Sequence, residues 1–328
     1  MNRLKWIDMA KGYGIILVVL GHLYIFNLSS WIYSFHMPLF FFISGYLFKA
    51  NINFRDFITK KIASLLKPYL FMALLIIMYR TIKNIAMGED NNILKDIFAF
   101  VLQRRETSLW FLTCLFIVSL FAFFIKKTNK TVQILIIISI TILGLMYEFY
   151  ISVPIIWNID IACTSLIFFM IGNYCRENRV MEILQKQKIS NKILYIFAAF
   201  MLSILGALAN NRISGNGLEM IYGNYGFWPL TYIVAIFGML FVVLISMIIN
   251  NKVISYIGVN SLIYFGLHQA IVLDLLNAIL KKYNLFQGIN SYMDIICYAI
   301  ISLLAVFGFL TAINIIIMKS KAKWFFNR

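Results

Sequence analysis

The sequence is poor in charged residues, in proline and in cysteine. Only 13% of its 328 residues are Asp, Glu, Lys or Arg, and it has four prolines and four cysteines. A soluble globular protein carries about 25% charged residues, so this chain lacks the polar surface that a water-soluble fold of its length needs. The low cysteine content excludes a secreted disulfide scaffold, and the apolar composition excludes a disordered chain.

What the chain has instead is apolar residues, which make up 62% of it. They form continuous runs, which are typical of membrane-spanning helices, whereas a membrane barrel alternates apolar and polar residues. Windows of about 20 residues predict spans at 10–28, 31–49, 64–82, 108–125, 131–149, 156–175, 191–209, 228–249, 254–279 and 294–318. We therefore predict an all-α, polytopic membrane helix bundle of about ten transmembrane helices. No loop is long enough for a soluble domain, so residues 1–328 are expected to form one domain.

Basic residues outnumber acidic ones, with 29 Lys and Arg against 13 Asp and Glu. Most of the basic residues fall on the side of the predicted bundle that holds both chain ends and the segments 49–67 and 176–192. Cytoplasmic loops of membrane proteins are enriched in Lys and Arg, so we predict that both termini are cytoplasmic and that no nucleic acid is bound. In the longest outer loop, residues 91–102 are expected to form a short amphipathic helix at the membrane surface.

Ionisable side chains inside the spans are few, and they include His22, His36 and His268. Such groups are costly in a membrane and are therefore functional candidates. Counting 1.5 Å of rise per residue places the three histidines at depths where they can line one cavity open to the outside. His22 follows Lys11 by about three helical turns, so both side chains project from one helix face, with Asp8 beside Lys11.

Less specific roles are also compatible with these positions. Lys11 at a helix end can extend to the membrane surface and pair with Asp8, and His22 can form an interhelical hydrogen bond. Three histidines at similar depth are compatible with a zinc site. None of them has the close His–His spacing of a local metal motif, and the cysteines form no Cys-x-x-Cys pair, so we expect no metal site.

Two N-terminal motifs carry a family resemblance. Residues 6–12, Trp-Ile-Asp-Met-Ala-Lys-Gly, followed by 15–21 and His22, resemble the first helix of acyltransferase family 3. Residues 35–48, which contain His-Met-Pro, are similar to that family's second-helix signature and to its fucose 4-O-acetylase-like branch. Weaker similarities follow at 109–112, 160–172 and 258–268. Proteins of this family are polytopic membrane enzymes that O-acylate extracellular glycans.

The resemblance implies an O-acetyltransferase that moves an acetyl group from cytoplasmic acetyl-CoA to a hydroxyl of a cell-surface polysaccharide or its lipid-linked precursor. The family pairs a basic residue, usually Arg, with a histidine about three turns later, and both are regarded as needed for transfer. Here these residues are Lys11 and His22. Lysine keeps the charge but lacks the planar bidentate group of arginine. We predict both residues as catalytic, with His22 as general base or acyl carrier.

Acetyl-CoA is expected to bind at the cytoplasmic mouth as a substrate, with no permanently bound cofactor. The residues expected at this site are Lys11, Asp8, Lys60, Lys61 and Lys67. Their positive charges suit the phosphates of CoA, and they are equally explained by the topology rule alone.

The acceptor is expected at the outer mouth. The residues expected there are His36, Glu148, Trp157, Asp160 and His268. Trp157 and Asp160, three positions apart, are predicted to share a helix face, where a ring beside a carboxylate suits a sugar. Trp157 is also compatible with an interfacial aromatic belt, His268 with a polar interhelical contact, and Ser44 and Gly45 with close helix packing.

A non-enzymatic exporter of polysaccharide or lipid-linked glycan is the alternative, because buried His and Asp residues also line transport pathways. Exporters built from inverted repeats show similarity between their two halves, and this sequence shows none. In either case the protein is expected in a cell membrane, most simply a bacterial cytoplasmic membrane.

Overall fold

The computed structural model describes residues 4–23, 28–215, 219–285 and 292–326. Within these ranges helices carry most of the backbone, and the β-type pairing consists of one bridge between Glu219 and Asn224. The α-helices are α1 (Lys5–Gly21), α2 (Leu28–Tyr33), α3 (His36–Tyr46), α4 (Phe54–Lys61), α5 (Lys67–Met87), α6 (Ile93–Leu102), α7 (Trp110–Ile125), α8 (Lys130–Tyr150), α9 (Ile159–Glu177), α10 (Val180–Lys186), α11 (Ile189–Ser214), α12 (Trp228–Ile248), α13 (Lys252–Val259), α14 (Ser261–Leu267), α15 (Asp274–Lys282), α16 (Tyr292–Lys319) and α17 (Lys323–Phe326).

Four shorter helical segments complete the described chain. Two are π-helical, η1 (Ile62–Leu66) and η4 (His268–Leu273), and two are 3₁₀-helical, η2 (Ile156–Asn158) and η3 (Met220–Tyr222). The π-helical segment η1 joins α4 to α5, and η4 joins α14 to α15, so each forms part of a longer continuous helix.

The prediction of an all-α, multi-pass membrane protein is confirmed. Seven helices in the described ranges are long and apolar enough to cross a membrane, namely 54–87, 130–150, 156–177, 189–214, 228–248, 261–282 and 293–319. The other three expected spans correspond to shorter helices, α1, α3 and α7, which have 17, 11 and 16 residues. The number of crossings, ten, and the side on which the termini lie stay predictions.

Several predicted boundaries are wrong. The first span was expected at 10–28, but α1 ends at Gly21, which leaves His22 at the end of a helix rather than in its middle. The second was expected as one helix over 31–49, but α2 and α3 are separate because the backbone of Phe35 leaves the helical region. The ninth, 254–279, is divided between α13 and α14 at Asn260.

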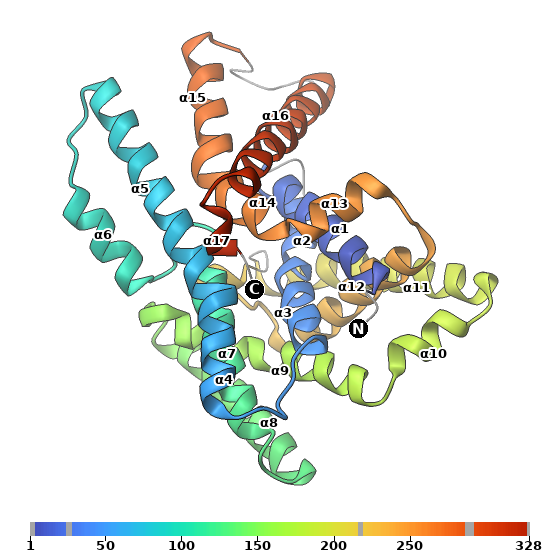
Figure 1. Cartoon of the computed structure of the whole chain (residues 1–328). Coiled ribbons are helices and arrows are strands. Elements are labelled where there is room, and N and C mark those ends of the chain that lie inside the picture. The colour runs from blue at the N-terminus through green and yellow to red at the C-terminus, as the bar shows by residue number, and fades with distance from the viewer. Residues whose placement is uncertain (1–3, 24–27, 216–218, 286–291, 327–328) are drawn as a thin grey trace.

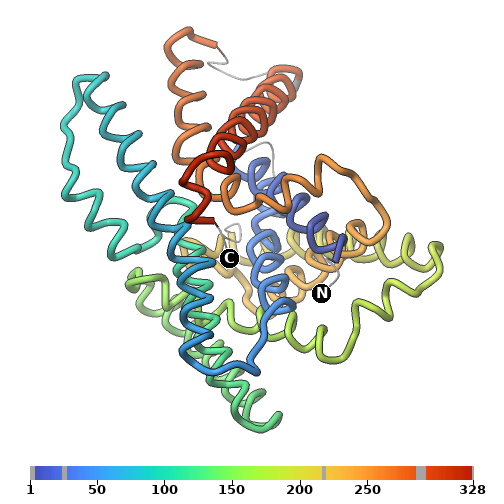
Figure 2. The backbone as a smooth tube through the Cα atoms, in the orientation of Figure 1, coloured from blue at the N-terminus to red at the C-terminus, as the bar shows by residue number. Residues whose placement is uncertain are grey.

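Helices α1 and α3 lie at the centre of the molecule, as Figures 1 and 2 show. Helix α3 packs on α9, and α1 packs on α12 and α13. Two pairs of helices project away from this centre (Figure 1). One pair is the hairpin of α5 and α6, and the other is α15 and α16.

The contact of α3 with α9 depends on glycine. A Cβ atom on Gly45 would overlap the carbonyl of Phe169, and one on Gly172 would overlap the carbonyl of Phe42. Small residues let helix backbones approach closely in membranes, where packing rather than hydrophobic burial drives association. The packing interpretation therefore holds for Gly45, whereas the neighbouring Ser44 lines a pocket described below.

The expected amphipathic helix in the long loop is present as α6. Asn92 caps it by accepting a hydrogen bond from the backbone N–H of Lys95. Its exposed apolar side chains are Ile93, Leu94, Ile97, Phe98 and Val101. An exposed apolar helix face beside a membrane bundle suits contact with lipid.

We expect Gly45→Ala to destabilise the protein by about 1–3 kcal/mol, the usual effect of overpacking, because the new methyl group forces α3 away from α9. Thermal unfolding in detergent should show a lowered midpoint. Gly308→Ala in α16 is the matched control, since a Cβ atom there meets nothing within 4 Å. Equal midpoints for both variants would contradict the proposed close contact.

Candidate functional site

The three histidines come together at one end of α1. His22 follows the last residue of α1, His36 begins α3, and His268 begins the π-helical segment η4. The ring centroids of His22 and His268 are 4.9 Å apart. The ring of Tyr33 joins the third histidine to this pair, with centroids 6.0 Å from His22 and 5.2 Å from His36.

Backbone carbonyl groups orient the imidazole rings. The Nδ1 atoms lie against carbonyl oxygens of the preceding helical turn: His22 on Val18 at 2.8 Å, His36 on Ile32 at 3.0 Å and His268 on Phe265 at 2.8 Å. A carbonyl oxygen only accepts hydrogen bonds, so each Nδ1 carries the proton and the neutral ring keeps a lone pair on Nε2. The cluster thus offers Nε2 atoms as bases or nucleophiles.

The π-helical segment places two further contacts at the cluster. The side chain of Gln269 forms a hydrogen bond with His22. The buried Nε2 of His268 has no hydrogen-bond partner among the described residues. Short π-helical insertions are frequent at functional sites, and this one turns two polar side chains toward His22.

A small cavity of about 60 Å³ lies beside His22 and His36. Its lining includes Ser108, Trp110, Gln269 and one carboxylate, Glu219. Burial raises the pKa of Glu219, which favours its neutral, proton-donating form. One water needs about 10–15 Å³ of such space, so the cavity has room for a few waters or a group the size of an acetyl.

The segment 219–226 separates this cavity from the carboxylate of Glu148. Glu219 and Tyr222 line the cavity on one side. On the other side Gly223 has φ of 70°, and a Cβ atom there would overlap the Glu148 carboxylate. Both the left-handed backbone and the close contact require glycine at this position.

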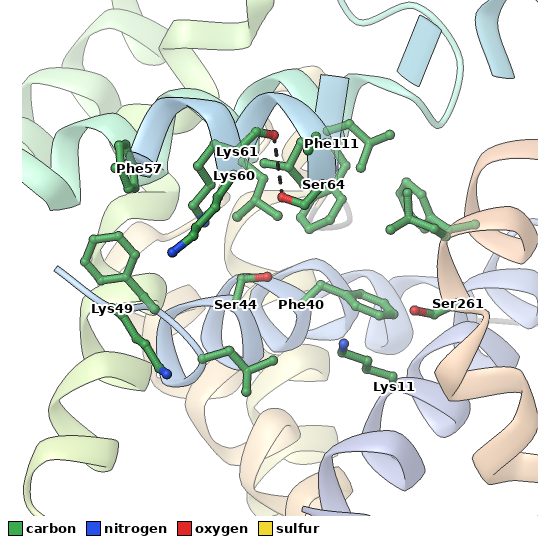
Figure 3. A pocket seen from close by; sticks show the side chains of 18 of the residues that line it. Lys11, Phe40, Ser44, Lys49, Phe57, Lys60, Lys61, Ser64, Phe111 and Ser261 are labelled. Carbon is green, nitrogen blue, oxygen red and sulfur yellow. Dashed lines mark hydrogen bonds between the residues drawn. The ribbon is translucent and has the colours of Figure 1, made fainter. Parts of the chain in front are cut away.

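A second cavity, of about 380 Å³, lies toward the other end of α1. Four lysines line it: Lys11, Lys49, Lys60 and Lys61. In Figure 3 they come from opposite sides, with Lys60 and Lys61 on α4 and Lys11 on α1, and with Ser44 between them on α3. No Asp or Glu occurs among the described residues that line this cavity. We call it the lysine pocket.

One aromatic side chain, Phe265, lines both cavities. Its ring centroid lies 6.3 Å from that of His268, 5.3 Å from Phe111 and 6.1 Å from Phe40. The three phenylalanines form a layer between the lysine pocket and the histidines, and we call them the phenylalanine layer. Phe40 and Phe111 also line the lysine pocket.

Two residues expected at the acetyl-CoA site lie elsewhere. Lys67 follows the π-helical turn η1, and its ammonium group lies 3.8 Å from the ring centre of Trp324 in a cation–π contact. Asp8 does not line the lysine pocket; its backbone carbonyl instead faces Gly258, where α1 and α13 meet. Lys11, Lys60 and Lys61 do line the pocket, as the sequence placed them together.

The expected acceptor cluster is divided by the structure. Glu148 and Asp160 are buried and share one partner, Arg105, whose guanidinium donates to Glu148 at 2.9 Å and to Asp160 at 2.8 Å. Burial opposes the charge of Arg105, but hydrogen bonding to Asp160 and the charges of both carboxylates outweigh it and raise the pKa of Arg105. These carboxylates therefore bind a neighbouring side chain, whereas His36 belongs to the histidine cluster.

Trp157 does not share a helix face with Asp160. Its backbone has φ of 57°, and helix α9 begins only at Ile159. The indole N–H of Trp157 donates to the carbonyl of Val101 at 3.0 Å, and its ring packs against Phe116. The expected ring-beside-carboxylate surface is therefore wrong, because the tryptophan precedes the helix.

The sequence reasoning missed four residues that touch the histidines or join the cavities: Tyr33, Glu219, Gln269 and Phe265. Tyr33 and Phe265 looked like ordinary apolar-span residues. Gln269 stands next to His268 and was the one detectable from sequence, as a polar side chain inside a span. In the described ranges, no group of three or more His, Cys, Asp or Glu side chains is arranged to hold a metal ion.

A comparison with protein families matches residues 4–313 to the family described as Acyltransferase domain. No curated protein and no solved structure matches the chain. The match includes the lysine pocket, the phenylalanine layer and the histidine cluster. The chain belongs to the acyltransferase 3 family and is a membrane acyltransferase.

Proposed function

We propose that this acyltransferase moves an acetyl group from cytoplasmic acetyl-CoA to a hydroxyl of a cell-surface polysaccharide or its lipid-linked precursor, in a bacterial cytoplasmic membrane. The observation that carries the proposal is the pair of cavities at opposite ends of α1, with Phe265 in the wall of both. Membership of an acyltransferase family favours this enzyme over the exporter alternative.

The lysine pocket suits the donor. CoA carries several phosphate charges, and four lysines lie in the lining of this pocket. Lysine binds phosphate as a point charge, so Lys11 fulfils this role without the planar group of arginine. At 1.5 Å per residue, Lys11 and His22 lie about 16 Å apart along α1, a span that the extended pantetheine arm of CoA can cross.

The histidine cluster suits the chemistry. As the acceptor hydroxyl attacks the thioester carbonyl, Nε2 of His22 takes its proton, and the tetrahedral intermediate collapses with loss of the CoA thiolate. The proton on His22 then passes to the thiolate, which leaves an ester, free CoA and a neutral imidazole. The same Nε2 atom is the nucleophile if an acyl-histidine forms first. In both routes the carbonyl of Val18 holds the ring through Nδ1.

We expect His22→Ala to abolish acetylation of the polysaccharide without reducing the amount of folded protein, because alanine leaves no unpaired charge. Acetate released by mild base from cell-surface polysaccharide measures the activity, in a strain without other acetyltransferases. Tyr13→Phe on the same helix is the control, and it should keep full activity. Wild-type acetylation by His22→Ala would refute the catalytic role of His22.

For the donor site, we expect Lys11→Ala to raise the KM for acetyl-CoA roughly 10- to 150-fold. This range corresponds to the loss of one charge-assisted hydrogen bond, which contributes about 1.5–3 kcal/mol of binding free energy. Lys11→Arg should keep most of the affinity because it keeps the charge. The control is Lys188→Ala, an exposed lysine outside the pocket. An unchanged KM in Lys11→Ala would leave this lysine as a surface anchor.

The orientation of the bundle is tested by labelling. In a protein with its four cysteines replaced, a membrane-impermeant thiol reagent added outside should label Asn91→Cys and should not label Asn51→Cys. Both positions are exposed, so access decides the result. The opposite labelling pattern would place the lysine pocket on the outer side, away from acetyl-CoA.

A further inference from the structure

A third cavity, of about 490 Å³, lies where the end of α5 meets α15. It is lined by Tyr79, Arg80, Lys83, Asn84, Asp96, Thr107, Gln269, Ala270 and Asp274. Polar and charged side chains make up nearly all of this lining, which distinguishes it from the mainly apolar lysine pocket. We call it the polar groove. Figure 1 labels three helices that contribute to its lining, α5, α6 and α15.

The charged side chains of the polar groove form ion pairs. Lys83 lies 2.7 Å from a carboxylate oxygen of Asp274, which also accepts a hydrogen bond from the Tyr79 hydroxyl at 2.6 Å. Arg80 lies 3.2 Å from Asp96 and 2.7 Å from Glu106, which stands behind the lining. The two basic and two acidic lining residues leave no net formal charge.

This composition contrasts with that of the lysine pocket, whose described lining includes four lysines and no Asp or Glu. A site with paired charges presents hydrogen-bond donors and acceptors side by side. Hydroxyl groups both donate and accept, so an uncharged ligand with many hydroxyls can satisfy such a surface. A phosphate only accepts, and it would meet two carboxylates in this groove.

Gln269 connects the polar groove to the reacting histidine. Its side chain lines both the polar groove and the small cavity beside His22, and it forms a hydrogen bond with His22. A ligand in the groove therefore lies one side chain from the proposed base. The π-helical segment η4 supplies both Gln269 and Ala270, so the same insertion shapes the groove and the cluster.

The larger cavity beside Glu148, of about 740 Å³, is a weaker candidate for the same ligand. The segment 219–226 separates it from the histidines. The Glu148 carboxylate already accepts from Arg105 with both oxygens, at 2.9 and 3.0 Å. Although this cavity is larger than the polar groove, a ligand bound in it would not reach His22.

We propose that the polar groove binds the acceptor as an uncharged, polyhydroxylated sugar unit, and that Gln269 directs one of its hydroxyls toward Nε2 of His22. This inference rests on the proposed acetyl transfer, and it replaces the sequence-based acceptor site at Glu148, Trp157 and Asp160. Tyr79 and the paired charges of Lys83 and Asp274 hold the sugar hydroxyls. Gln269 acts as a positioning residue between the groove and the base.

Filling the groove tests the proposal. Ala270→Phe should raise the KM for polysaccharide at least tenfold, with the KM for acetyl-CoA within twofold of wild type. The substrate is surface polysaccharide from the same cells, stripped of O-acetyl groups with mild base. Ala86→Phe, an exposed position on α5 outside the groove, is the matched control and should change neither value. Thermal stabilisation by acetyl-CoA shows that each variant is folded.

A charge change tests the class of ligand without adding bulk. Asp274→Asn removes one negative charge. If sugar hydroxyls donate to this carboxylate, the KM for polysaccharide should rise. A lowered KM would show an anionic acceptor and overturn the proposal of an uncharged sugar. A wild-type KM for polysaccharide in Ala270→Phe would show that the acceptor does not bind in the polar groove. If the unsubstituted protein consumed no acetyl-CoA, the proposed acetyl transfer itself would be overturned.

Discussion

Close contact between helix backbones decides where the side chains of the site point. Helix α3 meets α9 at Gly45 and Gly172, and α1 meets α13 at Gly12 and Gly258. Apolar side chains gain little by leaving lipid for protein, so this packing supplies much of the specificity of a membrane bundle. With α1 held by its backbone, its rotation is fixed. The lysine pocket and the histidine cluster at its two ends are then fixed relative to each other.

The helical class and the meeting of the three histidines were predictable from the sequence, because apolar length and buried ionisable groups are local properties of the chain. The lysine pocket was partly predictable, since basic residues near span ends share one side of a membrane. The exception, Lys67, packs on Trp324 at the far end of the chain, a contact that no local pattern indicates.

The residues of the predicted acceptor site differ from the expected arrangement for two different physical reasons. Trp157 lies before its helix, since the left-handed backbone at this residue and at Asn158 delays the start of α9. Helical periodicity therefore does not apply to it. Glu148 and Asp160 are bound by Arg105, which precedes them by 43 and 55 residues in the sequence. Only the tertiary fold identifies which carboxylates remain available to a ligand.

The phenylalanine layer has an electrical consequence. Cavities lie on both sides of it, and when water fills them, in the proposed orientation the membrane potential falls mainly across this thin apolar layer rather than across a full bilayer. Moving one elementary charge through 100 mV takes about 2.3 kcal/mol. In the proposed reaction the phosphates of acetyl-CoA stay with the lysines and outside this field, while the acetyl thioester that passes Phe265 is uncharged. Such a reaction would deliver an acyl group across the insulating part of the membrane with little electrical work.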